Sequence, residues 1–160
     1  LALLNLERPV VVGFSDGGNI ALELALRHPA SVGDFILVGA NLFPEGLKPA
    51  SKALTDAAHA AVVVGSRVAP HLEPLAERLG LMVHDPRIDP EQLAAISARV
   101  LVVVGERDAI RPEHSALIAN SLPHGELTVI PGAGHMIPVQ APAALADLVR
   151  DFAMPPEVAG

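Results

Sequence analysis

Three side chains, Ser15, Asp108 and His135, are of the types that together can activate a hydroxyl nucleophile. A serine hydroxyl is a weak nucleophile until a base removes its proton. An imidazole that titrates near neutral pH suits this task, and a buried carboxylate can orient the ring and stabilise the imidazolium that forms. We therefore predict Ser15 as the nucleophile, His135 as the general base and acid, and Asp108 as the orienting acid.

The serine lies in a glycine-bracketed turn between a predicted strand and a predicted helix. Residues 13–17 read Gly-Phe-Ser-Asp-Gly, and this stretch follows the β-branched run 10–12. Gly-x-Ser-x-Gly is common by chance, but a strand directly before it and an amphipathic helix directly after it are typical of a nucleophile elbow. Glycines two before and two after the serine are expected to relieve crowding in the tight turn. The backbone N–H of Asp16 would then donate to an oxyanion.

The elements that must position these residues form an alternating β/α pattern. Apolar, β-branched runs predict strands, and 3.6-residue periodicity predicts helices between them. Uniformly apolar strands are typical of a parallel sheet that helices cover on both faces, so the fold class is α/β with about four strands. The strands are expected at 10–12, 35–40, 99–105 and 126–130, and the helices after residue 15 to His28, at 112–122 and at 141–152.

In an open parallel sheet, functional groups collect beyond the carboxyl ends of the strands. The third predicted strand runs into Gly105-Glu106-Arg107-Asp108, and the fourth runs into Pro131-Gly132-Ala133-Gly134-His135. The serine, the aspartate and the histidine therefore follow three different strands. We expect them to converge at one edge of the sheet.

A proline-rich stretch interrupts the alternation between residues 42 and 97. It predicts a small helical insertion, with helices at 51–60, 71–83 and 90–97, whereas 61–65 could be helix or strand. We treat residues 1–160 as one domain with this insertion as a cap-like part. Residues 1–6 are expected to be the end of a helix, and the stretch from Pro155 a frayed tail.

Composition excludes several classes of protein. The net charge of −7 and the lack of a basic cluster argue against nucleic-acid binding. No apolar run approaches the ~18 residues that cross a bilayer, and no secretory signal is visible, so we expect no membrane association and a cytoplasmic location. The chain has no cysteine, which excludes disulfides and thiolate sites. The histidines have no ligand-like spacing, so neither a metal nor an organic cofactor is implied.

Each candidate also has a plainer interpretation. Asp108 could be a turn or helix N-terminal carboxylate, and Glu106 is the alternative acid, although it is expected to face solvent. His135 could be an ordinary loop histidine. Asp16 is more often a helix N-terminal charge than a residue that contacts substrate. His114 is expected at the surface.

Residues near the elbow and beneath the insertion could form a substrate pocket. Our candidates are Phe14, Asn41, Leu42 and Met136. A further apolar group, equally compatible with a core, could line an acyl pocket: Leu42, Phe43, Leu79, Leu81 and Met82.

The three motifs at 13–18, 105–108 and 132–135 resemble those of the α/β-hydrolase family, whose catalytic residues follow the order serine, aspartate, histidine. Ser-Asp-Gly-Gly at 15–18 followed by Val-Gly-Ala-Asn at 38–41 is similar to the valacyclovir-hydrolase-like branch of small-ester and amino-acid-ester hydrolases. Cofactor-free haloperoxidases and carbon–carbon bond hydrolases are also similar. The resemblance implies a serine esterase that needs no cofactor, with a cap over its site.

The resemblance also implies an incomplete sheet. In the family the elbow strand is the fifth of eight, so four strands and the loop with the second oxyanion donor would precede residue 1. The strand at 10–12 is then expected at an exposed edge, where it could pair with a second copy or with a missing N-terminal half. This leaves a second hypothesis: a weakly active or inactive hydrolase-like module that self-associates as a homodimer.

Overall fold

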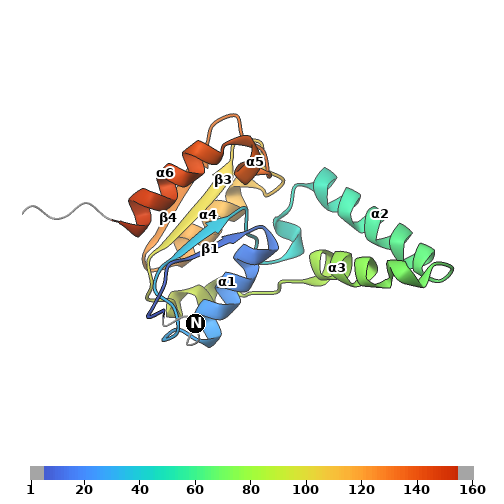
Figure 1. The fold of residues 1–160 in the computed structure, drawn as a ribbon, viewed down its shortest axis with the longest axis horizontal. Coiled ribbons are helices and arrows are strands. Elements are labelled where there is room, and N and C mark those ends of the chain that lie inside the picture. The colour runs from blue at the N-terminus through green and yellow to red at the C-terminus, as the bar shows by residue number, and fades with distance from the viewer. Residues whose placement is uncertain (1–5, 155–160) are drawn as a thin grey trace, which may run out of the picture.

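Four parallel strands form the centre of the computed structural model, which describes residues 6–154 (Figure 1). The strands are β1 (Val11–Phe14), β2 (Phe35–Val38), β3 (Val100–Gly105) and β4 (Gly125–Ile130), and they lie side by side in that order. Val11, Phe35, Val100 and Gly125 pair at one level, so all four carboxyl ends reach the same edge. The predicted parallel α/β sheet is confirmed.

Helices cover the two faces of the sheet, as the apolar strands require. Helices α1 (Asp16–Arg27) and α4 (Pro112–Ser121) pack on one face, in a core that includes Leu22, Leu37 and Ile118. The short α5 (Ile137–Gln140) and α6 (Pro142–Ala153) cover the other face. Neighbouring strand residues enter opposite cores because side chains alternate along a strand.

The segment between β2 and β3 forms a helical hairpin that extends from the sheet (Figure 1). It consists of α2 (Pro49–Ser66) and α3 (Glu73–His84), with short 3₁₀ turns at Pro44–Gly46 and Pro70–Leu72. The ambiguous residues 61–65 are helical. The helix expected at 90–97 is instead a 3₁₀ helix at Pro90–Ala95, whose first turn is capped by the Asp89 carboxylate.

Strand β1 forms one edge of the sheet and β4 the other, and the side chain of Val12 in β1 is 47% exposed. Leu6 is not helical; the rest of the helix end expected at 1–6 lies outside the described residues, as does the tail from Pro155. Within residues 6–154, the helices are too short or too polar to cross a bilayer.

Candidate active site

Ser15 occupies a strained turn between β1 and α1. Its φ of 54° and ψ of −119° lie in a region that residues with a side chain rarely adopt. A Cβ on Gly13 would collide with the backbone carbonyl of Gly17, and one on Gly18 would lie 2.8 Å from Cβ of Ala40. A Cβ on Gly17 would meet no described atom within 4 Å, so the expected crowding falls at Gly13 and Gly18, not at Gly17.

The structure brings Ser15, His135 and Asp108 together in one hydrogen-bonded chain. Nε2 of His135 lies 2.9 Å from Oγ of Ser15, and Nδ1 of the same ring lies 2.8 Å from Oδ1 of Asp108. This geometry fits a ring that donates from Nδ1 to the carboxylate and accepts the hydroxyl proton at Nε2. A hydroxyl held in this way can be deprotonated as it attacks an electrophilic carbon.

The Asp108 carboxylate is buried, with an exposure of 2%. Burial alone raises the pKa of Asp108, but the hydrogen bond from His135, the backbone N–H groups of Ile110 and Gly105, and the charge of a protonated His135 together outweigh it. The pKa of Asp108 therefore lies below its ordinary value. The acid remains ionised at neutral pH, which is the state that can stabilise an imidazolium.

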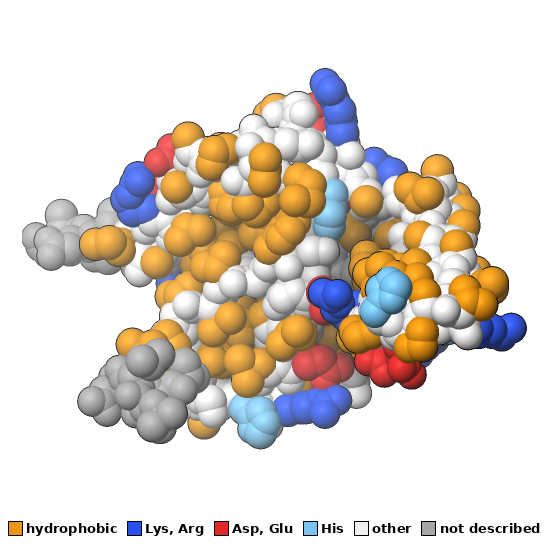
Figure 2. Space-filling model, turned by 45° about the vertical axis from the view of Figure 1, so that its right-hand side comes forward, with side chains coloured by type: hydrophobic (Ala, Val, Ile, Leu, Met, Phe, Trp, Pro, Cys, Tyr) orange, Lys and Arg blue, Asp and Glu red, His pale blue; other side chains and the backbone are white. Residues whose placement is uncertain are grey.

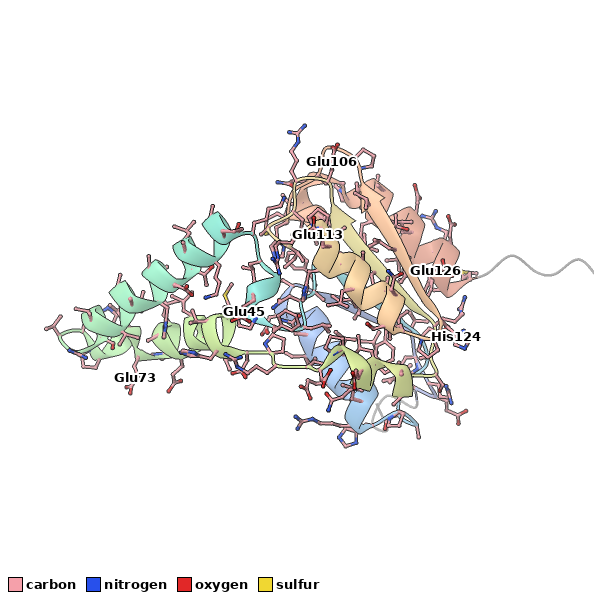
Figure 3. The ribbon with its side chains drawn as sticks, turned by 180° about the vertical axis from the view of Figure 1, so that it is seen from behind. Glu45, Glu73, Glu106, Glu113, His124 and Glu126 are labelled. Atoms are coloured by element: carbon pink, nitrogen blue, oxygen red, sulfur yellow. The ribbon has the colours of Figure 1, made fainter. Side chains whose placement is uncertain are left out.

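Glu106, the alternative acid, has a different partner. Its carboxylate accepts a hydrogen bond from the backbone N–H of Gly132 and does not bind the imidazole. Figure 3 shows Glu106 at the end of the sheet where β3 finishes, whereas His124 and Glu126 lie at the opposite end.

The first turn of α1 faces the serine with free donors. The N–H groups of Gly18 and Asn19 bind the carbonyl of Ser15, but those of Asp16 and Gly17 have no described backbone acceptor. The start of a helix attracts negative charge through such N–H groups and the helix dipole. The N–H of Asp16 is thus available to an oxyanion formed at Ser15.

A cavity of about 290 Å³ opens beside Ser15 and His135. The hairpin forms part of its wall through Leu54, Thr55 and Met82, and the sheet side contributes residues such as Asn41 and Ile110. The described lining residues are Ser15, Asp16, Asn19, Gly39, Asn41, Leu47, Ser51, Leu54, Thr55, Met82, Asp85, Ala109, Ile110 and His135.

Of the predicted pocket residues, the described lining includes Asn41 and Met82. It does not include Phe14, Leu42, Phe43, Leu79, Leu81 and Met136. Leu42 is fully buried in the core, because the chain turns inward after β2. Phe14 packs beside the His135 ring, with ring centroids 5.4 Å apart, and contacts the core below it. Met136 is 48% exposed at the start of α5.

Asn19 lines the cavity although no motif singled it out. Its Oδ1 accepts from the Asn41 backbone N–H at 2.9 Å, and its Nδ2 donates to Oδ1 of Asn41 at 3.2 Å. Nδ2 of Asn41 donates in turn to the carbonyl of Phe43. The sequence feature that could have identified Asn19 is its position four residues after Ser15, about one helical turn along α1. This buried pair ties the elbow helix to the chain leaving β2.

His114 is buried, with an exposure of 3%, and the expectation of a surface residue is wrong. Its Nε2 accepts from the backbone N–H of Leu42, and its ring packs edge-on against Phe43. Burial and the nearby charge of Arg111 lower the pKa of His114 to about 4. The ring is therefore neutral at pH 7, as an acceptor at Nε2 requires.

No trio of histidine, aspartate and glutamate side chains within residues 6–154 is arranged to hold a metal ion. The cavity lining instead combines apolar side chains with hydroxyl, amide and carboxylate groups. Such a site suits a small, partly apolar organic molecule.

Comparison with known proteins identifies the family. The sequence profile described as "Alpha/beta hydrolase family" matches residues 1–148. A 2-hydroxymuconate semialdehyde hydrolase of Pseudomonas putida is 28% identical over 181 residues. The match covers 95% of this chain and 64% of that protein, so the chain spans less than two thirds of its length.

Similar solved structures also extend beyond the matched region. One described as "Est816 as an N-Acyl homoserine lactone degrading enzyme" is 26% identical with a TM-score of 0.69, covering 95% of this chain and 70% of that one. A hydrolase from Pseudomonas aeruginosa PA01 is 27% identical with a TM-score of 0.67, covering 95% and 67%. By its sequence profile and its sheet, this chain belongs to the alpha/beta hydrolase family.

Proposed function

We propose that this chain is a serine hydrolase that cleaves a small carboxylic ester through an acyl-enzyme. The observation that carries this proposal is the continuous contact from Asp108 through His135 to the hydroxyl of Ser15, which is held in a strained turn at the cavity. A structural role alone would not require a strained serine beside an imidazole and a buried acid.

The reaction would proceed in two halves. Oγ of Ser15 attacks the ester carbonyl while Nε2 of His135 takes its proton, and the N–H of Asp16 stabilises the oxyanion. The imidazolium then protonates the leaving alcohol, and an acyl ester remains on Ser15. A water molecule, deprotonated by His135, hydrolyses this ester and releases the carboxylic acid.

The relatives support hydrolysis, but their names describe different substrates. The name of the Pseudomonas putida relative indicates hydrolysis of a semialdehyde, whereas Est816 is described as degrading N-acyl homoserine lactones, which are cyclic esters. We favour an ester because its cleavage needs only the hydrogen-bonded Ser15, His135 and Asp108 together with an oxyanion donor. Carbon–carbon bond hydrolysis and perhydrolysis are the alternative reactions of the same groups.

Labelling with a fluorophosphonate, which reacts with activated serines, tests the proposal. We expect the wild-type chain to be labelled and Ser15→Ala to remain unlabelled while retaining its circular dichroism spectrum. The exposed Ser97→Ala is the matched control, and it should label like the wild type. Equal labelling of Ser15→Ala and the wild type would contradict the assignment.

A second candidate function, self-association, is favoured by the β1 edge. The N–H groups of Val11 and Ser15 bind the β2 side, so those of Val12 and Phe14 point away from the sheet. Val12 in this edge strand is 47% exposed. Figure 2 shows a broad group of hydrophobic side chains on one face of the molecule. This edge could pair with β1 of a second copy or with a further segment of a longer protein.

Sedimentation equilibrium tests self-association. A homodimer through β1 predicts twice the monomer mass for the wild type and a monomer for Val12→Lys, which places a charge at the edge. Val129→Lys, at the other edge strand, is the matched control and should leave the dimer intact. A monomeric wild type with a folded spectrum would exclude pairing between copies.

A further inference from the structure

We propose that Glu106 and Gln140 are positioning residues that hold the loop carrying His135 in its working geometry. The inference rests on the proposed function, because it assigns these residues a role in placing the general base. Each side chain accepts a hydrogen bond from a backbone N–H group of this loop: Glu106 from Gly132 and Gln140 from Gly134.

The turn after β3 forms three hydrogen bonds with residues 132–135, the loop that carries His135. Oε2 of Glu106 accepts from the N–H of Gly132 at 2.7 Å, and the N–H of Arg107 donates to the carbonyl of Ala133 at 2.8 Å. Asp108 then holds the imidazole of His135 at 2.8 Å. Glu106 and Asp108 therefore fix the two ends of one short segment from the same turn.

Gln140 holds the loop from the other side. Its Oε1 accepts from the N–H of Gly134, directly before His135, at 2.6 Å. Its own backbone N–H binds the carbonyl of Met136 within the single turn of α5. The side chain of Gln140 therefore hydrogen-bonds back to Gly134, so that residues 134–140 form a closed loop that contains His135.

The loop needs these hydrogen bonds because its own residues restrict its backbone conformation very little. Residues 132–134 are Gly-Ala-Gly, and Gly132 has a φ of +70°, so the backbone has many conformations to lose. His135 must meet the hydroxyl of Ser15 and the carboxylate of Asp108 at once. A displacement of about 1 Å at a reacting group can lower a rate by ~10²-fold.

The placement of the two residues separates this role from packing and from substrate binding. Both side chains are solvent-exposed, so truncating them removes little of the core. Neither is among the described residues that line the cavity, and the hydrogen bonds described for their side chains are to Gly132 and Gly134. Their loss should therefore slow the reaction at Ser15 without weakening binding in the cavity.

The test compares each truncation with a variant that keeps an acceptor oxygen. Gln140→Ala and Glu106→Ala remove the acceptor, whereas Gln140→Glu and Glu106→Gln retain one at the same distance along the side chain. We would measure fluorophosphonate labelling against probe concentration, separating the maximal rate from the half-saturating concentration. Thermal midpoints and amide hydrogen exchange at Gly132 and Gly134 are recorded in parallel.

We expect each alanine variant to lower the maximal labelling rate roughly 10-fold or more. The half-saturating concentration should stay within about twofold, and the acceptor-retaining variants should recover most of the rate. Exchange should accelerate at Gly132 in Glu106→Ala and at Gly134 in Gln140→Ala. A merely structural role would instead lower the thermal midpoint without separating the rate from binding.

Three results would overturn the proposal, and they are distinguishable. A labelled wild type with alanine variants of unchanged maximal rate would remove the positioning role and leave the proposed function standing. A wild type that is folded but unlabelled would remove the proposed function and, with it, the role of both residues. Equal losses in the alanine and acceptor-retaining variants would also contradict the role of the hydrogen bonds.

Discussion

The imidazole of His135 lies directly against the backbone of Gly39. A Cβ on Gly39 would be 2.9 Å from Cε1 and 3.0 Å from Nδ1 of the ring, and 3.6 Å from Oδ2 of Asp108. Gly39 also has a φ of +64°; it directly follows β2 and lines the cavity. Both its conformation and its neighbours therefore require glycine.

Gly39→Ala should consequently displace the imidazole. We expect the fluorophosphonate labelling rate of this variant to fall roughly 10²-fold, because a shift of about 1 Å is enough to misalign the base. Gly80→Ala in α3 is the matched control, since its Cβ would make only an ordinary contact of 3.4 Å with His59. Labelling of Gly39→Ala at the wild-type rate would show that the ring position is not critical.

Asp108→Asn should keep the shape of the site but lose its charge. The amide cannot stabilise an imidazolium, and its NH₂ group favours the wrong tautomer of His135, so we expect a loss of roughly 10⁴-fold in kcat. The measurement is turnover of p-nitrophenyl acetate at pH 7, with Glu106→Asn as the comparison at the neighbouring carboxylate. The loss in Glu106→Asn should be much smaller, and equal losses would argue against Asp108 as the orienting acid.

His114 should make stability depend on pH between about 6.5 and 4. Its pKa is about 4 in the folded chain and about 6.5 when unfolded, so in this window the unfolded state binds more protons. Stability contributed by the neutral ring is complete above pH 6.5 and is lost as the pH falls towards 4, by up to about 3 kcal/mol. Urea unfolding at pH 7.5, 5.5 and 4.5 measures the effect.

His114→Gln is the variant that isolates this contribution. The Oε1 of glutamine can accept from the N–H of Leu42, as Nε2 does, but it does not titrate. The difference in unfolding free energy between pH 7.5 and 4.5 should therefore shrink in this variant. An unchanged difference would assign the pH dependence to other groups.

Met82 should limit the length of the acyl group. It lines the cavity from α3, so Met82→Ala enlarges the space there. We expect the ratio of kcat/KM for p-nitrophenyl hexanoate to that for the acetate to rise roughly 3- to 10-fold. One methylene in a hydrophobic pocket is worth about 1–3 kcal/mol, and the half-exposed Met82 encloses the chain only in part. Leu81→Ala, outside the described lining, should not change the ratio.

The alternating elements were predictable because each depends on local pattern. The apolar runs gave all four strands and the parallel sheet, and the glycines and prolines located their ends to within a few residues. Strand β2 stops at Val38, not at residue 40, because Gly39 adopts a positive φ. The order of strand ends then brought Ser15, Asp108 and His135 to one edge, which is where the structure has them.

Contacts between distant segments that do not follow from the order of the strand ends were not predictable from pattern. His114 lies on a helix with weak amphipathic pattern, and its burial follows from the chain that crosses it at Leu42, 72 residues away. Leu42 itself was assigned to the pocket because it is apolar and close to Asn41, yet it turns into the core. The short α5 and the amide pair of Asn19 and Asn41 likewise depend on tertiary neighbours.

The hairpin has a consequence for the volume of the cavity. Every residue of α2 is described and none is buried, and in α3 only Ala76 is buried. Its two stems, by contrast, are joined where the N–H of Ile88 binds the carbonyl of Leu42 in the core. The first stem is also bound to the loop after β3, through the N–H of Lys48 on the carbonyl of Ala109 and the Leu47–Ile110 bridge. We therefore expect the helices of the hairpin, rather than its stems, to open at low free-energy cost. The volume beside Ser15 is thus set partly by a wall that few buried side chains hold in place, whereas its sheet side adjoins the packed core.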